Sequence, residues 1–363
     1  MKVRLVCYEE VDRWIMGKFA LRMRDNLQQL QIDVDIAMQA DPAADINHHI
    51  VFEGYEPGSA PSSRHTLMIT HVDDIRKLEL IKEQLKTAAA GVCMSRETQQ
   101  QLAQLGADKN RLCYINPAHD GVVAIRKHRI GICCRVQEDG RKREYFIDKL
   151  AKRLDPAYFK FVIMGDSWEP QVAALQKNGF EVDYTNRFIY NQYVELIPTL
   201  DYYLYMGMDE GQMGFIDALA AGVKTIVTAQ GYHLDAPNGI VHPYTSYEEL
   251  EAIFLQLEDE KKKLVDAVAT WNWMDYTIKH VEIWNHLLGK QEQPSPFADG
   301  LNSLLNMQQS ELQTDHSFID AKRKELTQNK FRRSYYHKTG RLKRTYRTEG
   351  IAGVIRLVTS KFF

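Results

Sequence analysis

Residues 204–228 read LYMGMDEGQMGFIDALAAGVKTIVT and contain a strand, a loop, a helix and a second strand in succession. Apolar runs at 202–205 and 225–228 predict the strands, and residues from about 212 to 221 predict a helix that ends at Gly222. A strand–helix–strand unit of this kind is the building block of parallel α/β sheets. The loop before the helix holds Asp209 and Glu210, and Asp217 lies inside the helix.

The same alternation of short apolar runs and amphipathic segments extends outward from this unit. It predicts two Rossmann-like domains of an α/β protein, at 1–122 and 123–289, facing each other across a cleft. A helix at 273–288 is expected to cross back and brace the first domain. The pattern then changes to a linker and helix at 290–320 and a basic tail at 321–363. Strands are predicted at 3–8, 34–38, 49–52, 66–70, 91–94, 112–115, 129–134, 159–164, 181–184, 202–205 and 225–228.

The overall charge hides a strong asymmetry along the chain. The 363 residues include 46 Lys and Arg and 48 Asp and Glu, a formal net charge of −2. Residues 321–363 alone hold 13 basic and 2 acidic side chains, a local charge of +11, which leaves −13 on the rest. Asymmetry of this kind favours an anionic surface as partner.

Composition and missing motifs exclude several classes of protein. No run of about 18 apolar residues predicts a membrane span, and no cleaved secretion signal is evident. The five cysteines are odd in number and favour reduced thiols in a cytoplasmic protein. The chain lacks both G-x-G-x-x-G after the first strand and G-x-x-x-x-G-K-[ST], which argues against nicotinamide dehydrogenases and P-loop NTPases. No cluster predicts a metal site.

The carboxylates of 204–228 suggest a ligand site at a strand end. Asp209 or Glu210 is placed to cap the helix or to accept hydrogen bonds from ligand hydroxyls. Asp217 stands among apolar residues of the helix and is expected to need a partner. A ribose diol is favoured for it over a buried salt bridge.

This block resembles a known family. Asp209, seven residues, Asp217 and then ALAAG are similar to the E-x7-E and E-A-x-A-x-G block of family 4 retaining glycosyltransferases, with aspartates in place of both glutamates. The resemblance implies the GT-B fold over residues 1–290. It also leaves open whether Asp209 or Glu210 contacts the donor sugar.

The resemblance further assigns residues around a nucleotide-sugar donor. Arg135 and Lys142 would grip the diphosphate and, with Asp209, form the catalytic set. His233 and Asp235 would line the cleft. The other donor-binding positions would be Asp217, Glu210, Gly211, Gly165, Tyr184 and His71.

The function implied is transfer of a sugar from a nucleotide-diphosphate sugar to a glycan or lipid-linked acceptor, with retention and without a metal or other cofactor. Synthesis of bacterial-type surface polysaccharide or glycoconjugate is the expected setting. The alternatives are an enzyme like the nucleotide-sugar 2-epimerases, or a non-catalytic GT-B scaffold that binds nucleotide sugars.

The tail interleaves cations with aromatic residues and ends in an amphipathic segment. Ile351, Val354, Ile355 and Val358 share one helical face there. The favoured prediction is that the tail attaches to an anionic membrane surface, the inner face of the cell membrane. An oligomer contact or docking on the acidic body comes second. Nucleic-acid binding comes last, because the body shows no basic groove.

Overall fold

The structure is a computed structural model that describes residues 1–290 and Leu305, apart from 9–10, 13, 59 and 61–63. The described chain divides into two compact units. Unit 1 comprises Met1–His119 together with the chain from Trp271 onward, and unit 2 comprises Asp120–Thr270. The expected linker, its helix and the basic tail lie outside the described residues. Within the described part, no helix is long and apolar enough to cross a membrane.

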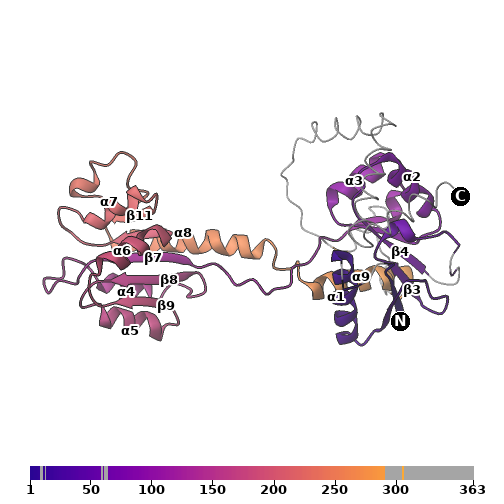
Figure 1. Ribbon diagram of the computed structural model, residues 1–363, viewed down its shortest axis with the longest axis horizontal. Coiled ribbons are helices and arrows are strands. Elements are labelled where there is room, and N and C mark those ends of the chain that lie inside the picture. The colour runs from indigo at the N-terminus through magenta and orange to yellow at the C-terminus, as the bar shows by residue number, and fades with distance from the viewer. Residues whose placement is uncertain (9–10, 13, 59, 61–63, 291–304, 306–363) are drawn as a thin grey trace, which may run out of the picture. The chain divides into compact units, whose positions relative to one another are not determined.

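Unit 1 is built on a six-stranded parallel sheet with the strand order β2-β1-β3-β4-β5-β6 (Figure 1). Alternate residues of each strand face opposite sides, so Met68 packs with α1 and α9 while its neighbours Leu67 and Ile69 pack with α2 and α3. The elements are β1 (Lys2–Val6), α1 (Ile15–Gln29), β2 (Asp33–Ala37), β3 (Ile46–His49), β4 (Arg64–Ile69), α2 (Ile75–Gln84), β5 (Ala90–Cys93), α3 (Arg96–Gln104), β6 (Leu112–Tyr114) and α9 (Trp273–Leu287).

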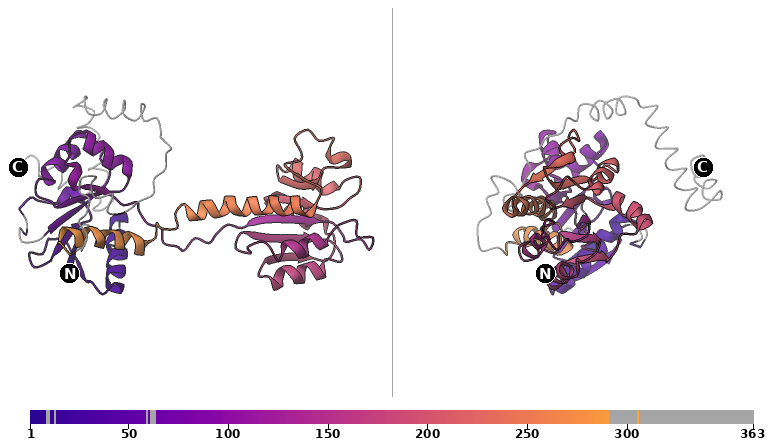
Figure 2. Two further views of the ribbon diagram at one scale, coloured as in Figure 1. Left: turned by 180° about the vertical axis from the view of Figure 1, so that it is seen from behind. Right: turned by 90° about the vertical axis from the view of Figure 1, so that its left-hand side faces the viewer.

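Helix α9 is part of unit 1 and not of the second domain to which its residues were assigned by sequence. Its buried face packs on the same core as α1, and the rings of Phe19 and Trp273 meet edge to face at 5.0 Å. The left view of Figure 2 shows α9, in orange, beside the sheet of unit 1. An isolated bridge between His119 and Asn272 joins the chain where it leaves unit 1 and where it returns. Apolar burial on unit 1 therefore fixes the helix there.

Unit 2 also contains a six-stranded parallel sheet, with the order β12-β11-β10-β7-β8-β9. One face packs on α4, α5 and α8, and the other on α6 and α7. The predicted α/β class with two Rossmann-like units is thus confirmed. The elements are β7 (His128–Cys133), α4 (Tyr145–Leu150), β8 (Phe159–Met164), α5 (Glu169–Lys177), β9 (Glu181–Thr185), α6 (Tyr190–Leu196), β10 (Tyr202–Tyr205), α7 (Met213–Ala220), β11 (Lys224–Thr228), β12 (His242–Tyr244) and α8 (Tyr247–Asp266).

Strand β3 differs from the sequence expectation. It spans Ile46–His49, whereas the prediction placed a strand at 49–52. Its polar residues are buried because each finds a partner: Asn47 bonds the backbone of Asp41, and His48 Nδ1 lies 2.9 Å from Thr66 Oγ1. Strand β12 was not predicted at all.

Candidate functional site

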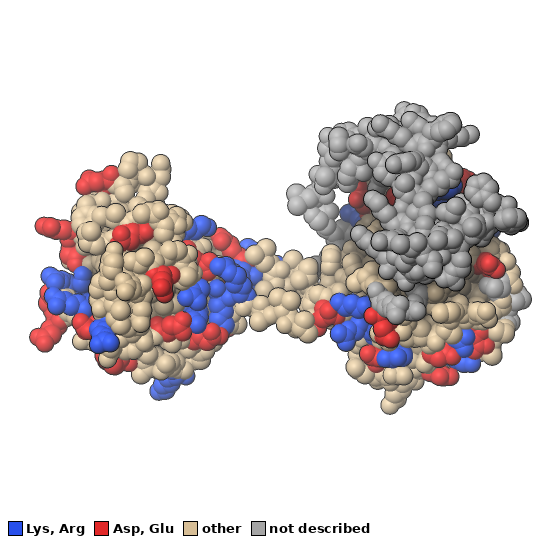
Figure 3. All heavy atoms as spheres, viewed as in Figure 1, with Lys and Arg blue, Asp and Glu red and all other residues tan. Residues whose placement is uncertain are grey.

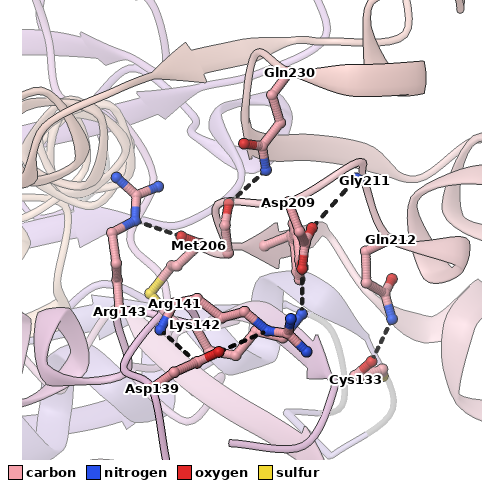
Figure 4. A network of polar contacts seen from close by, with 12 residues as sticks. Cys133, Asp139, Arg141, Lys142, Arg143, Met206, Asp209, Gly211, Gln212 and Gln230 are labelled. Carbon is pink, nitrogen blue, oxygen red and sulfur yellow. Dashed lines mark hydrogen bonds and ion pairs between the residues drawn. The ribbon is translucent and has the colours of Figure 1, made fainter. Parts of the chain in front are cut away.

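The crevice between β7 and β10 is the topological switch point of unit 2. From β7 the chain adds β8 and β9 on one side, and from β10 it adds β11 and β12 on the other. In doubly wound sheets, ligands bind outside the carboxyl ends of the strands at such a point. The loops after β7 and β10 meet there and bring together side chains that are 67 positions apart in the sequence (Figure 4).

Lys142, Tyr205 and Asp209 form a closed ring of polar contacts at this crevice. The Lys142 ammonium lies 2.7 Å from Asp209 Oδ2 and donates to Tyr205 Oη at 2.5 Å. Tyr205 Oη in turn lies 2.7 Å from both carboxylate oxygens, and Gly211 N–H donates to Asp209 Oδ1 at 3.2 Å. The structure therefore places the predicted Lys142 and Asp209 together and adds Tyr205, which the sequence analysis missed.

The electrostatics of the ring favour an ionised carboxylate. Burial acts to raise the pKa of Asp209, but hydrogen bonds from Lys142 and Tyr205, the charge of Lys142 and the Gly211 N–H outweigh it and lower that pKa. Burial and the neighbouring carboxylate raise the pKa of Tyr205, so its hydroxyl keeps its proton. Lys142 is itself buried. The ring is thus a neutral pair of opposite charges bridged by a phenol.

Arg143, which follows Lys142, has a structural role. Its guanidinium is buried and donates to the Met206 carbonyl at 2.5 Å, to Thr228 Oγ1 at 2.5 Å and to the Thr245 carbonyl at 2.6 Å. These acceptors lie at the carboxyl ends of β10, β11 and β12, so one side chain joins three neighbouring strand ends. Arg141 instead is exposed and lies 3.6 Å from Asp139. Of the three cations at 141–143, only Lys142 belongs to the ring.

His233 is buried and does not line a cleft, which corrects the prediction. The Gln212 N–H donates to His233 Nε2 at 3.0 Å, so the ring hydrogen is on Nδ1, which donates to the Thr228 carbonyl at 3.1 Å. Both nitrogens are used to hold the first turn of α7 in place. The Gln212 side chain donates to the Cys133 carbonyl at 2.7 Å and ties the same turn to β7. Gln212 was another residue that sequence reasoning missed.

Asp217 also differs from its prediction. The residue is exposed on α7 and accepts a hydrogen bond from Tyr193 Oη of α6 at 2.5 Å. The expected need for a partner is thus met by Tyr193, and the alternative of a buried salt bridge is wrong because the helix turns this position toward solvent. A role in binding ribose stays a prediction that rests on the resemblance.

The remaining donor-site candidates of unit 2 surround the same strand ends. Arg135, two residues after β7, is exposed and has no hydrogen bond or ion pair with the residues that the structure describes. Glu210 and Asp235 are exposed as well, and no side-chain partner is found for either within that same part of the chain. Tyr184 is partly exposed and donates to Glu169 Oε1 at 3.0 Å.

The two candidate glycines shape backbone around the crevice. Gly165 has a φ of +148°, and a Cβ there would lie 2.0 Å from the Cys134 carbonyl oxygen, so only glycine lets the loops after β7 and β8 approach this closely. Gly211 has a φ of +125° and packs under the Tyr232 ring. Both positions need glycine for the fold, whatever they bind.

His71 lies in unit 1, two residues after the end of β4. It is exposed, has a φ of 50°, and its carbonyl accepts a hydrogen bond from Lys77 Nζ at 2.9 Å. A positive φ at a residue other than glycine is uncommon and marks a constrained turn. Its predicted contact with the donor sugar stays a prediction.

Unit 1 holds a second polar cluster, at the carboxyl ends of β1 and β3. His65 Nε2 donates to the Ala60 carbonyl at 3.1 Å, His49 Nε2 donates to His65 Nδ1 at 3.0 Å, and Tyr8 Oη donates to His49 Nδ1 at 3.0 Å. The carbonyl can only accept, so it fixes which group donates in each of the three hydrogen bonds. Burial and the neighbouring His65 lower the pKa of His49 to about 3, so the His49 ring is neutral near pH 7.

Among the described residues, no group of three or more His, Cys, Asp or Glu side chains is placed to hold a metal ion. Figure 3 shows basic and acidic side chains side by side on the visible face of both units.

Comparison with known proteins gives a likeness of fold only. No model of a known protein family matches the sequence, and no curated protein matches it significantly. Among solved structures, Anabaena HepE in complex with UDP and glucose is 11% identical, with 79% of this chain and 100% of that chain covered at a TM-score of 0.32. The lipopolysaccharide outer core galactosyltransferase WaaB is 12% identical, with 80% and 100% covered at 0.31. Sucrose-phosphate synthase from Thermosynechococcus elongatus is 9% identical, with 80% and 100% covered at 0.32.

Proposed function

We propose that this protein is a GT-B glycosyltransferase that moves a sugar from a nucleotide-diphosphate sugar to an acceptor hydroxyl. The observation that carries the proposal is the Lys142 ammonium, held at the switch point of unit 2 with two of its three N–H donors used by Asp209 and Tyr205. The third donor has no acceptor among the described residues. A fixed cation with a spare donor at this edge of a Rossmann-like sheet suits a diphosphate.

In the proposed reaction the bond between C1 of the donor sugar and the phosphate oxygen breaks. Negative charge develops on the departing diphosphate, and Arg135 and Lys142 stabilise it. The acceptor oxygen forms a bond to C1 on the same face, and its proton goes to the departing phosphate oxygen. The configuration at C1 is thereby retained, and no metal ion takes part.

The other candidate residues have supporting parts in this scheme. Asp217 is proposed to bind the ribose, and Gly165 and Tyr184 border the place of the nucleobase. Glu210 and Gly211 lie beside the sugar, with Asp235 nearby. A glycan or lipid-linked acceptor would be held by unit 1, where His71 is proposed to contact the sugar.

The test is a thermal-shift screen with nucleoside diphosphates and their sugars, because a ligand that binds only the folded state raises its melting temperature. UDP and UDP-glucose come first, since HepE has been solved with each. We expect one nucleotide to raise the midpoint by several degrees, and its sugar to be transferred or slowly hydrolysed. Binding without turnover would indicate a scaffold. Release of nucleotide with an altered free sugar would indicate an epimerase, and no binding would refute the proposal.

We also propose that residues 321–363 attach the protein to the inner face of the cell membrane. The support is the local charge of +11 together with the apolar face formed by Ile351, Val354, Ile355 and Val358. Deleting this tail should abolish co-sedimentation with vesicles that contain anionic lipid and leave nucleotide binding intact. Neutral vesicles are the control, and sedimentation that survives the deletion would contradict the proposal.

A further inference from the structure

We propose that Asp209 is a positioning residue for Lys142 and does not bind the donor sugar. This inference rests on the proposed function and concerns the same crevice. It replaces the role that the resemblance gives to Asp209.

The first argument is that both oxygens of Asp209 are already occupied. Oδ2 accepts from the Lys142 ammonium at 2.7 Å, and Oδ1 accepts from the Gly211 N–H at 3.2 Å. The Tyr205 hydroxyl lies 2.7 Å from each oxygen and has one proton to share between them. These three donors use three of the about four lone-pair sites of the carboxylate, so little of it is left for a sugar hydroxyl. The neighbouring Glu210 is exposed and has no side-chain partner in the described part of the chain, so its carboxylate is open to a ligand.

The second argument is that Lys142 is fixed from two directions at once. Its side chain is held by Tyr205 and Asp209. Its backbone lies between the Arg141 carbonyl, which accepts from the Met208 N–H at 2.9 Å, and the buried guanidinium of Arg143. Without the Asp209 carboxylate, the ammonium would lose its only ion-pair partner among the described residues.

The consequence for a diphosphate is a competition for Lys142. In the empty site the carboxylate balances the ammonium charge. An incoming diphosphate shares the ammonium with Asp209 and lies near a second negative charge, which weakens its binding. Asp209 therefore keeps Lys142 in place for the reaction and favours departure of the nucleotide product afterwards.

The test compares Asp209→Asn with Glu210→Gln in the full chain. Each substitution removes one negative charge and keeps the size of the side chain, but only the first removes the ion-pair partner of Lys142. Isothermal titration would use pyrophosphate, which probes the diphosphate position without a nucleobase, then the nucleoside diphosphate found in the screen and its sugar.

For Asp209→Asn we expect pyrophosphate and the nucleoside diphosphate to bind about tenfold more tightly, because a nearby like charge is gone. Turnover should fall, because Lys142 loses its ion-pair partner and is positioned by Tyr205 alone. For Glu210→Gln the affinity for pyrophosphate should change by less than about twofold, since water and salt screen an exposed charge. Its affinity for the nucleotide sugar should fall. Unchanged or weaker diphosphate binding by Asp209→Asn, with selective loss of the nucleotide sugar, would overturn the inference.

Failure of the inference and failure of the proposed function give different results. If the wild-type protein binds neither pyrophosphate nor any nucleoside diphosphate, the proposed function fails. The ion pair is then still tested by acetylating lysines and measuring Lys142 by mass spectrometry, where Asp209→Asn should increase its labelling several-fold. Equal labelling in the two proteins would overturn the positioning role. If the Asn variant does not fold, Asp209→Ser removes the same charge and repeats both measurements.

Discussion

Replacing Arg143 with methionine should destabilise unit 2 by about 3 kcal/mol, the largest effect on stability that we expect from a single loop residue. The guanidinium makes three hydrogen bonds, to the Met206 and Thr245 carbonyls and to Thr228 Oγ1. Methionine keeps most of the buried apolar length but donates to none of them. Three acceptors at neighbouring strand ends would then lose this partner, and restoring their solvation would require those ends to separate.

The measurement can be made specific to unit 2. Trp168 is the only tryptophan in Asp120–Thr270 and is fully buried, so fluorine NMR of protein labelled with 5-fluorotryptophan follows this unit through a urea titration. The matched control is Arg141→Met, two residues earlier and exposed, which should change the free energy of unfolding by less than about 0.5 kcal/mol. Equal losses in the two variants would show that Arg143 does not hold the strand ends together.

Replacing Arg135 with alanine should lower turnover by about 100-fold or more, because one donor aimed at a developing negative charge contributes about that factor. The side chain follows the end of β7 and is exposed, and it has no partner among the described residues, so its charge is available to a ligand. Because it is not needed for packing, the melting temperature of the free protein should stay within a degree or two.

The kinetic comparison should separate turnover from binding. We expect kcat to fall far more than the affinity for the nucleotide, because the charge on the diphosphate grows as the bond breaks. The control is Lys177→Ala, which removes an exposed cation from the last residue of α5. This residue lies near the amino ends of the strands, whereas Arg135 lies near their carboxyl ends, so kcat should change by less than about threefold. If Arg135→Ala kept wild-type turnover, the proposed role of Arg135 would be wrong.

Local sequence signals located most of the strands and helices correctly. Serine is a favoured residue directly before a helix, and the Ser95 hydroxyl accepts a hydrogen bond from the Thr98 N–H at 3.1 Å. Gly222 was predicted to end α7 and has a φ of +73° directly after that helix. These features depend on a few consecutive residues, whose backbone preferences are expressed wherever the segment lies in the fold.

The predictions that failed concerned the environment of polar residues. Asp217 was expected to bind a ribose diol or form a buried salt bridge, yet it is exposed and bonds Tyr193. His233 was expected in a cleft and is buried. The residues around His48 and His49 were given a strand at 49–52, yet β3 spans Ile46–His49 and lies between β1 and β4. In each case burial depends on which strand or helix lies alongside, and that neighbour is distant in the sequence.

By itself, then, the sequence determined the α/β class, the two parallel sheets and the strand ends at which Arg135, Lys142 and Asp209 stand. Periodic apolar residues suffice for this, because burial of apolar surface is non-directional and needs no particular partner. Only the tertiary structure decided that Lys142 pairs with Asp209 through Tyr205, and that Arg143 beside it joins three strand ends instead of facing a ligand. Hydrogen bonds and ion pairs are directional and short-ranged, so their partners are fixed only when β7 and β10 lie side by side.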